Sequence, residues 1–361
     1  DFYARHFNEL GAEAIEIVAN ATPMQNQWAR EHNVHARGLQ IVMEQLKDWR
    51  PHVVWLQDSI SFSGDFVREL RNSIPEVQVI LGNICSPFGR QLIDKFGYMD
   101  GVTTCSPHFV HQLEKEGLTV LLLHHAFEPS VLSEIEIPQR AGNDFVFIGS
   151  IVSGKGFHEQ RIQILETLLQ EGIVPDFKGN IEYLSAVELN KRRLAYLLAH
   201  GLSAIGLGKY LEGMPGMNKA MQLGALPSQV HMSKTLRQLA QAPVYGRDML
   251  EALANARIGF NTHVDAAGPY PANMRLFETT GVGTLLLTDA KRDMERLFEP
   301  GKEIVTYNSA SDCVDKVQWL LQHPEERQQI ALAGQKRCLG EHTYEKRARK
   351  LDDYLRTRFL R

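Results

Sequence analysis

The sequence has few cysteines, no strong excess of either charge and no long hydrophobic run. Its longest apolar stretches, such as Thr119–Leu123 and Thr284–Leu287, have the length of a β-strand, whereas a membrane helix needs ~20 residues. An integral membrane protein is therefore not expected. The 39 Lys and Arg residues nearly balance the 43 Asp and Glu residues, so the chain carries no basic footprint for nucleic acid and no nucleic-acid partner is expected.

The four cysteines, at positions 85, 105, 313 and 338, form no C-x-x-C pair. Neither a zinc site nor a thioredoxin-like motif is therefore predicted. So few cysteines in 361 residues are typical of a reducing compartment, and no apolar segment of the secretory type opens the sequence. The sequence also contains no P-loop, no G-x-G-x-x-G and no D-x-D motif. We predict a cytoplasmic protein, with peripheral membrane association at most.

Strand-like and helix-like segments alternate along most of the chain, which is typical of parallel sheets covered by helices. The length of 361 residues suggests two such α/β domains. The strands predicted in the first half are Ala14–Val18, His52–Gln57, Val77–Leu81, Gly101–Cys105 and Thr119–Leu123. Those predicted in the second half are Phe145–Ile148, Ile258–Asn261, Thr284–Thr288 and Glu303–Tyr307.

The predicted organisation has four parts. A first domain covers residues 1–130, a Pro- and Gly-containing linker 131–143, a second domain 144–342, and a basic amphipathic helix 343–361 that we expect to pack back on the first domain. An α/β domain rarely begins with a helix that leads into an inner strand, so we expect a further strand upstream of residue 1. The segment 181–241 has no regular pattern and is not assigned.

The most informative segment follows the strand that ends at Asn261. A loop with Gly268 leads to a helix predicted from Asn273, and free N–H groups at a helix N-terminus suit a phosphate. Arg275 in its first turn can add a charge-assisted bond, and Glu278 offers a carboxylate for ribose hydroxyls. The structural alternatives are an ion pair for Arg275 and a helix-surface charge for Glu278.

Two further segments carry candidate ligand contacts. His263 and Asp265 form an H-x-D at a strand end, which predicts a metal pair, a loop contact to the donor, or plain structural hydrogen bonding. A second loop begins at Ser150, contains Lys155 between two glycines, and leads to His158 and Arg161. Glycines allow a ligand to approach the backbone while Lys and Arg supply positive charge, although a lone Gly-rich loop is a weak signal.

These segments resemble the donor half of GT-B glycosyltransferases, most closely the spore-maturation-type (CgeB-like) group. The resemblance rests on FIGSIVSGKGFHEQR, on NMRLFETTGVGTLLLTDA and on LFEPGKEIVTY. It implies two Rossmann-like domains that face a central cleft, with Glu278 on the nucleotide ribose and Tyr245 in the loop near the base. Many retaining members carry a second Glu eight positions before the first; here that position is Tyr270, which leaves the stereochemical outcome open.

In the first domain the strand ends are the places to look for the acceptor, because ligands bind at the carboxyl ends of parallel strands. Asp58 is the first candidate for a general base and His108 the second. The alternatives are a turn aspartate and a helix-capping histidine. His124 and His125 end the next strand, where a hinge position and a catalytic one are equally plausible.

The sequence therefore predicts a metal-independent glycosyltransferase that needs no cofactor, for polysaccharide or glycoprotein assembly at the bacterial surface. Its expected partners are a nucleotide-diphosphate sugar and a glycan, lipid-linked or protein acceptor. The expected donor contacts are Ser150, His158, Arg161, Tyr245, His263, Asn273, Arg275 and Glu278. A sugar-nucleotide epimerase or hydrolase of the same fold, and a two-domain solute-binding protein, remain alternatives.

Overall fold

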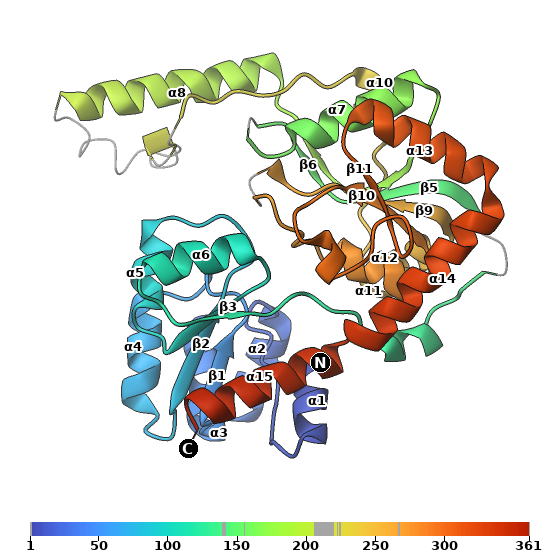
Figure 1. Ribbon diagram of the computed structural model, residues 1–361. Helices are drawn as coiled ribbons and strands as arrows, with labels where there is room; N and C mark the ends of the chain where they lie inside the picture. Colours follow the sequence, from blue (N-terminus) through green and yellow to red (C-terminus); the bar gives the residue numbers. More distant parts are fainter. Residues whose placement is uncertain are drawn as a thin grey trace.

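Two parallel β-sheets with helices on their faces make up the protein (Figure 1). The computed structural model describes residues 2–138, 142–154, 156–205, 220–221, 223, 225–265 and 268–360. All strand pairs in both main sheets are parallel, which confirms the predicted α/β class.

The first sheet has four strands in the order β1-β2-β3-β4. Its strands are β1 (Val53–Leu56), β2 (Val79–Asn83), β3 (Gly101–Thr104) and β4 (Val120–Leu122). The helices that alternate with them are α3 (Leu39–Trp49), α4 (Gly64–Ser73), α5 (Arg90–Phe96) and α6 (Pro107–Lys115). Gly38, just before α3, has a φ of 56°, a left-handed conformation that favours glycine and ends the preceding loop.

The prediction of a strand at Ala14–Val18 is wrong. Residues 12–18 form no regular structure between α1 (Phe2–Glu9) and α2 (Thr22–Glu31). A cavity of about 980 Å³ lies between this segment and β1 and is lined by residues of both. The alternation of apolar residues at Ile15 and Ile17 imitates a strand, but the backbone has no ladder partner across that cavity.

The second sheet has five strands in the order β11-β10-β9-β5-β7. They are β5 (Asn143–Ile148), β7 (Asp176–Lys178), β9 (Ala256–Phe260), β10 (Leu285–Asp289) and β11 (Val305–Tyr307). The helices around them are α7 (Glu159–Gln170), α11 (Gly246–Ala254), α12 (Arg275–Gly281), α13 (Ala310–Gln322) and α14 (Pro324–Glu341). Two short strands, β6 (Ile151–Val152) and β8 (Ile181–Glu182), pair beside this sheet. Phe147 and Phe260, in the two central strands, are fully buried in its core.

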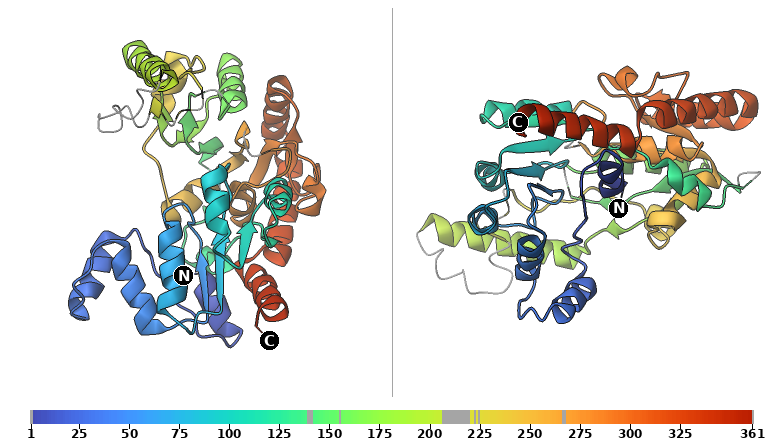
Figure 2. Two further views of the ribbon diagram at one scale, coloured as in Figure 1. Left: turned by 90° about the vertical axis from the view of Figure 1, so that its left-hand side faces the viewer. Right: turned by 90° about the horizontal axis from the view of Figure 1, so that it is seen from below.

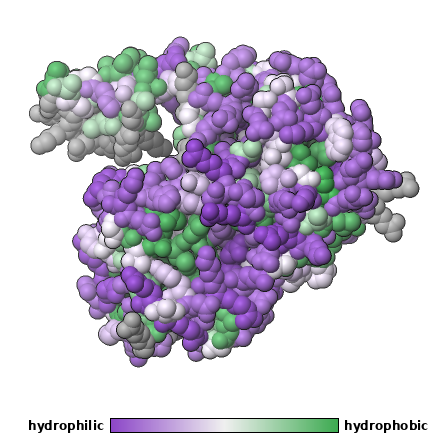
Figure 3. All heavy atoms as spheres, viewed as in Figure 1, coloured by the Kyte–Doolittle hydropathy of each residue, from purple (hydrophilic) through white to green (hydrophobic). Residues whose placement is uncertain are grey.

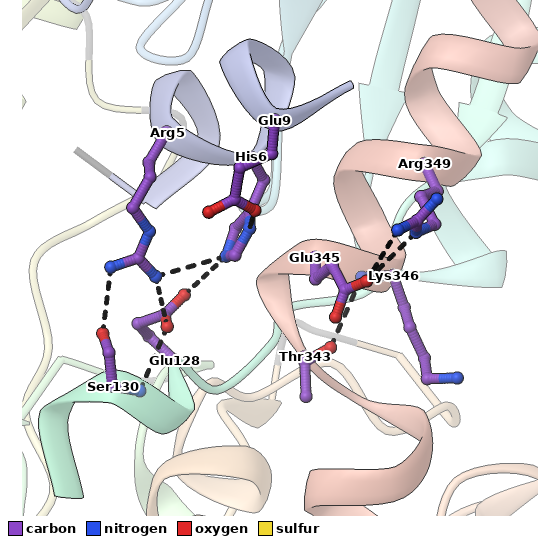
Figure 4. A network of polar contacts seen from close by, with 9 residues as sticks. All are labelled: Arg5, His6, Glu9, Glu128, Ser130, Thr343, Glu345, Lys346 and Arg349. Carbon is purple, nitrogen blue, oxygen red and sulfur yellow. Dashed lines mark hydrogen bonds and ion pairs between the residues drawn. The ribbon is translucent and has the colours of Figure 1, made fainter. Parts of the chain in front are cut away.

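The chain returns to the first sheet through its last helix, α15 (Tyr344–Arg358), shown in red beside α1 in Figure 1. Leu351 and Leu355 of α15 pack with Leu81 of β2 in one apolar cluster. Between the halves, Glu128 accepts from Arg5 at 2.5 Å and lies 2.9 Å from Nε2 of His6 (Figure 4). The first helix, the crossover and the last helix therefore hold the two sheets together.

Helix α8 (Ala186–Ala204) projects away from the second sheet, and apolar residues gather on it (Figures 2 and 3). Its exposed apolar side chains include Val187, Leu194 and Leu197. Within the part of the chain that the structure describes, no helix combines the length and the hydrophobicity that crossing a bilayer requires.

Candidate functional site

The loop after β9 joins the carboxyl ends of the two sheets. Gly268 in this loop packs on His108, since a Cβ added there would lie 2.7 Å from Cγ of that ring. Cys105, just after β3, has its Sγ 3.6 Å from the carbonyl oxygen of Ala272 in the same loop. Because ligands of parallel α/β sheets bind at the carboxyl ends of strands, the residues around this loop form the candidate site.

Arg161 on α7 is the central cation of the site on the second sheet. Its NH1 donates to the carbonyl of Ser150 and its NH2 to the carbonyl of Thr262, each at 2.6 Å. Burial lowers the pKa of this guanidinium to about 10, which leaves it charged at neutral pH. Two loops that follow adjacent strands are thus fixed by one buried positive charge.

His263 pairs with Asp289, which ends β10. The distance from Nδ1 of His263 to Oδ1 of Asp289 is 2.7 Å, and Lys291 contacts the other carboxylate oxygen at 3.1 Å. Burial alone would raise the pKa of Asp289, but the His263 ring and Lys291 together hold it well below its usual range. Asp289 therefore stays ionised and orients the imidazole, whose Nε2 is buried without a partner.

Asp265 uses one carboxylate oxygen to accept from the backbone N–H of Glu159 at 2.7 Å, and its other oxygen is buried without a partner. The acid that bonds the His263 ring is Asp289, which comes from another strand.

Arg275 and Glu278 face each other at the start of α12. Their side chains form an ion pair of 2.6 Å, and NH2 of Arg275 also donates to the carbonyl of Ile148 at 3.3 Å. Asn273 caps the backbone N–H of Arg275 at 3.1 Å and donates to Asn261 at 2.8 Å. The helix begins at Arg275 rather than at Asn273, with Met274 at the N-cap position.

Buried polar atoms without partners are concentrated here. Eight such side-chain atoms occur among the described residues, and four of them surround the loop after β9: Arg161 Nε, His263 Nε2, Asp265 Oδ1 and Arg275 Nε. Buried polar atoms in native proteins are nearly always paired. Two unpartnered guanidinium N–H groups, one on α7 and one at the start of α12, thus indicate a place for an anionic, oxygen-rich ligand.

The other predicted donor contacts lie around the same site. Ser150 is exposed at the end of β5. His158 is buried and accepts from the N–H of Val152 at 2.9 Å, and burial with the charge of Arg161 lowers its pKa to about 4. Tyr245 is 72% exposed at the N-cap of α11. Lys155 lies outside the described residues.

The two candidate bases differ in their surroundings. Asp58 is exposed after β1, where it accepts from Ser61 Oγ at 2.5 Å and from the N–H of Ile60 at 3.2 Å, as a turn aspartate does. His108 is half-buried and touches Gly268 of the other half. The structure therefore brings His108, and not Asp58, against the loop of the candidate site.

Sequence reasoning missed Asp289, Lys291 and Thr262. The available signal was their position, because Asp289 closes a predicted strand and Thr262 follows one. A cavity of about 980 Å³ lies elsewhere, beside β1, and is lined by Asp58 but by none of the predicted donor contacts. The site on the second sheet is identified by its unpartnered polar atoms and not by an enclosed volume.

Comparisons with known proteins agree with this arrangement. Residues 219–353, less than half of the chain, match a family model described as "Glycosyl transferase-like". This match includes α12, Arg275 and Glu278 but not Arg161 or His158. No curated protein matches the sequence.

Several solved structures share the fold at low sequence identity. Anabaena Alr3699/HepE in complex with UDP is similar over 92% of this chain and 89% of that chain, with a TM-score of 0.55 and 9% identity. A glycosyltransferase from Rickettsia africae ESF-5 is similar over 99% of this chain and 93% of that chain, with a TM-score of 0.56 and 10% identity. Sucrose-phosphate synthase from Thermosynechococcus elongatus is similar over 89% of this chain and 78% of that chain, with a TM-score of 0.51 and 13% identity. The chain thus has the two-sheet fold of the GT-B glycosyltransferases, as predicted.

Proposed function

We propose that this protein is a glycosyltransferase that moves a sugar from a nucleoside-diphosphate donor to an acceptor hydroxyl. The observation that carries the proposal is the pair of buried, unpartnered Nε–H groups of Arg161 and Arg275 at the carboxyl end of the second sheet. The match of residues 219–353 to a glycosyl transferase-like family supports it. So does the complex of similarly folded HepE with UDP-glucose, which makes uridine the first base to test.

In the proposed donor site, the two guanidinium groups and Lys291 face the diphosphate, and Glu278 accepts from ribose hydroxyls. The negative charge that develops on the leaving diphosphate is then stabilised by fixed cations. Arg161 suits this role because burial and two carbonyl partners hold it in one geometry. Ser150, His158, Tyr245, His263 and Asn273 are proposed as the further contacts to the donor.

The same cations are the reason to propose metal-independent transfer at the donor site. Side-chain cations can replace the divalent ion that other transferases place on the diphosphate. The bond from the backbone N–H of Glu159 to Asp265, and the bond of His263 to Asp289, support a structural role for the H-x-D residues over a metal pair. No cofactor is proposed.

The acceptor is proposed to bind against the first sheet, with His108 as the group that removes the hydroxyl proton if the reaction inverts the anomeric centre. Its contact with Gly268 supports this choice over Asp58. Tyr270, in place of a second glutamate, leaves both stereochemical outcomes open. The proposed acceptors are a glycan, a lipid-linked sugar or a protein, in cytoplasmic assembly of bacterial surface polysaccharide or glycoprotein by an enzyme of the CgeB-like group.

The test is incubation with a panel of nucleotide-diphosphate sugars, with and without candidate acceptors, while free nucleoside diphosphate and products are measured. Acceptor-dependent release is the expected result. Equal release without any acceptor would indicate a hydrolase, and an altered sugar still attached to the nucleotide would indicate an epimerase. Binding of a free solute without affinity for any nucleotide would indicate a solute-binding protein.

A further inference from the structure

Three side chains that are far apart in the sequence meet at the carboxyl edge of the first sheet. Cys85 follows β2, Cys105 follows β3 and His125 follows β4. Two Sγ atoms and one ring nitrogen lie within 4.8 Å of one another, and this is the one cluster of three potential metal ligands that the described residues form. The register of adjacent parallel strands, and not a local motif, brings them together.

The backbone beneath this cluster is firmly held. The ladder continues past the strands, because Ile84 donates to Thr103 at 3.1 Å and Leu123 donates to Thr104 at 2.8 Å. Arg347 of α15 donates to the carbonyl oxygen of His125 through Nε at 3.3 Å and through NH2 at 3.2 Å. The three side chains are thus attached to a rigid edge, as a preorganised metal site requires.

The chemistry of the three groups favours zinc. Thiolate and imidazole are its preferred ligands, and bond lengths of about 2.3 Å to sulfur and 2.0–2.1 Å to nitrogen place tetrahedral ligand atoms about 3.6–3.8 Å apart. The observed spacing reaches that range with shifts of about 1 Å.

We propose that Cys85, Cys105 and His125 bind one Zn²⁺ ion at the surface where the two halves meet. Three protein ligands leave a fourth position for water or another oxygen ligand. The ion would lie beside the loop after β9, because Cys105 Sγ is 3.6 Å from the carbonyl oxygen of Ala272. The half-buried side chains of Cys85 and His125 give the ion a route from solvent. This site is on the other sheet from the proposed donor site and does not depend on it.

The first test uses the whole chain, purified with a phosphine reductant and without chelators from cells grown with zinc. Elemental mass spectrometry is expected to find about one zinc per chain. After removal of zinc, Co²⁺ titration is expected to produce a near-ultraviolet thiolate-to-cobalt band that saturates at one equivalent. The proposal would be overturned if the protein retained no zinc and gave no such band. This outcome counts only when all four thiols react with a thiol reagent, which shows that they are reduced. A Cys85–Cys105 disulfide that forms in air, with no metal bound in the reduced state, would assign a redox role to the pair and overturn it as well.

The second test locates the site. Cys105→Ser and His125→Ala should each weaken Co²⁺ binding by roughly 10²-fold or more, which exceeds typical effects of residues that only support ligands. Cys313→Ala and His111→Ala are the matched controls, since Cys313 is buried in the other half and His111 is exposed on α6. Equal binding in the Cys105 and Cys313 variants would contradict the assignment. If a ligand variant fails to fold, the wild-type metal content still decides.

Discussion

Gly268 and His108 are in van der Waals contact across the two halves of the molecule. The glycine has a φ of +79°, and a Cβ added there would lie 2.7 Å from Cγ and 2.9 Å from Cδ2 of the imidazole. The loop after β9 therefore packs directly on the first turn of α6. This contact places a titratable side chain of one sheet beside the loop that carries the candidate donor site of the other.

We expect Gly268→Ala to disturb this contact more than backbone strain alone explains. Gly301 is the control, because its φ is +82° and nothing lies within 4 Å of an added Cβ. Both substitutions carry the ~1–2 kcal/mol cost of a left-handed alanine. Thermal unfolding should show a larger loss for Gly268→Ala, with a fall in kcat that Gly301→Ala does not share. Equal effects of the two variants would show that the contact is incidental.

The choice of base is testable by a pair of substitutions. We expect His108→Ala to lower kcat by ~10² or more with unchanged nucleotide affinity, as the loss of a general base does. Asp58→Asn keeps the shape of the turn and should leave kcat within a few-fold of wild type. The opposite order would restore Asp58 as the base. If neither variant loses activity, and the product retains the anomeric configuration, the leaving phosphate is the remaining group that can take the proton.

Much of the fold follows from local sequence patterns. Continuous apolar runs such as Leu285–Leu287 identify buried parallel strands, and the position of Arg275 and Glu278 after a strand and a Gly- and Pro-rich loop marks them as candidate ligand contacts. The error at Ala14–Val18 has a physical cause, because alternation of apolar residues reports a half-buried backbone and not a ladder partner.

The tertiary partners were not predictable in the same way. The H-x-D pattern draws attention to Asp265, two residues from His263, whereas the acid that orients the imidazole, Asp289, is 26 positions further on in the neighbouring strand. The cluster of Cys85, Cys105 and His125 likewise has no local signature, since it depends on strand register. Spacing along the chain reveals helix faces and turns, but not which strand ends become neighbours.

Stability should fall in mild acid because of His342. Its Nε2–H donates to the carbonyl of Leu297 at 2.7 Å and its Nδ1 accepts from Arg347 at 3.1 Å. Burial and nearby arginines lower its pKa to about 4, below the ~6.5 of an unfolded chain. The unfolded state therefore binds more protons between these values, so this contribution is complete above pH ~6.5 and is lost toward pH ~4.

His342→Gln keeps one donor and one acceptor but does not titrate. Between pH 7 and pH 5 we expect the variant to lose about 2 kcal/mol less stability than wild type, measured by denaturant unfolding. His111→Gln, at an exposed position, is the control and should follow the wild-type curve. Parallel pH profiles for all three proteins would contradict the assigned role of His342.

Nucleotide binding should not require a divalent ion. Arg161, Arg275 and Lys291 supply the positive charge, so calorimetric affinity for a nucleoside diphosphate should be the same in EDTA and in Mg²⁺ or Mn²⁺. Removal of an ion from the cysteine cluster should leave this affinity unchanged, since the cluster belongs to the other sheet. Loss of binding in EDTA that Mg²⁺ or Mn²⁺ restores would refute a donor site built from side-chain cations.

The most direct test of the donor site is calorimetric titration of the best-bound nucleoside diphosphate into wild type, Glu278→Ala and Glu345→Ala. Glu345 is a suitable control because it also pairs with an arginine, Arg349, at 2.9 Å, but on the exposed side of α15. Loss of hydrogen bonds to a charged group costs about 1.5–3 kcal/mol, so Glu278→Ala should bind ~10–100-fold more weakly while the free protein stays folded. Glu345→Ala should bind as wild type does. Unchanged affinity in Glu278→Ala, or no binding of any nucleoside diphosphate by wild type, would contradict the account.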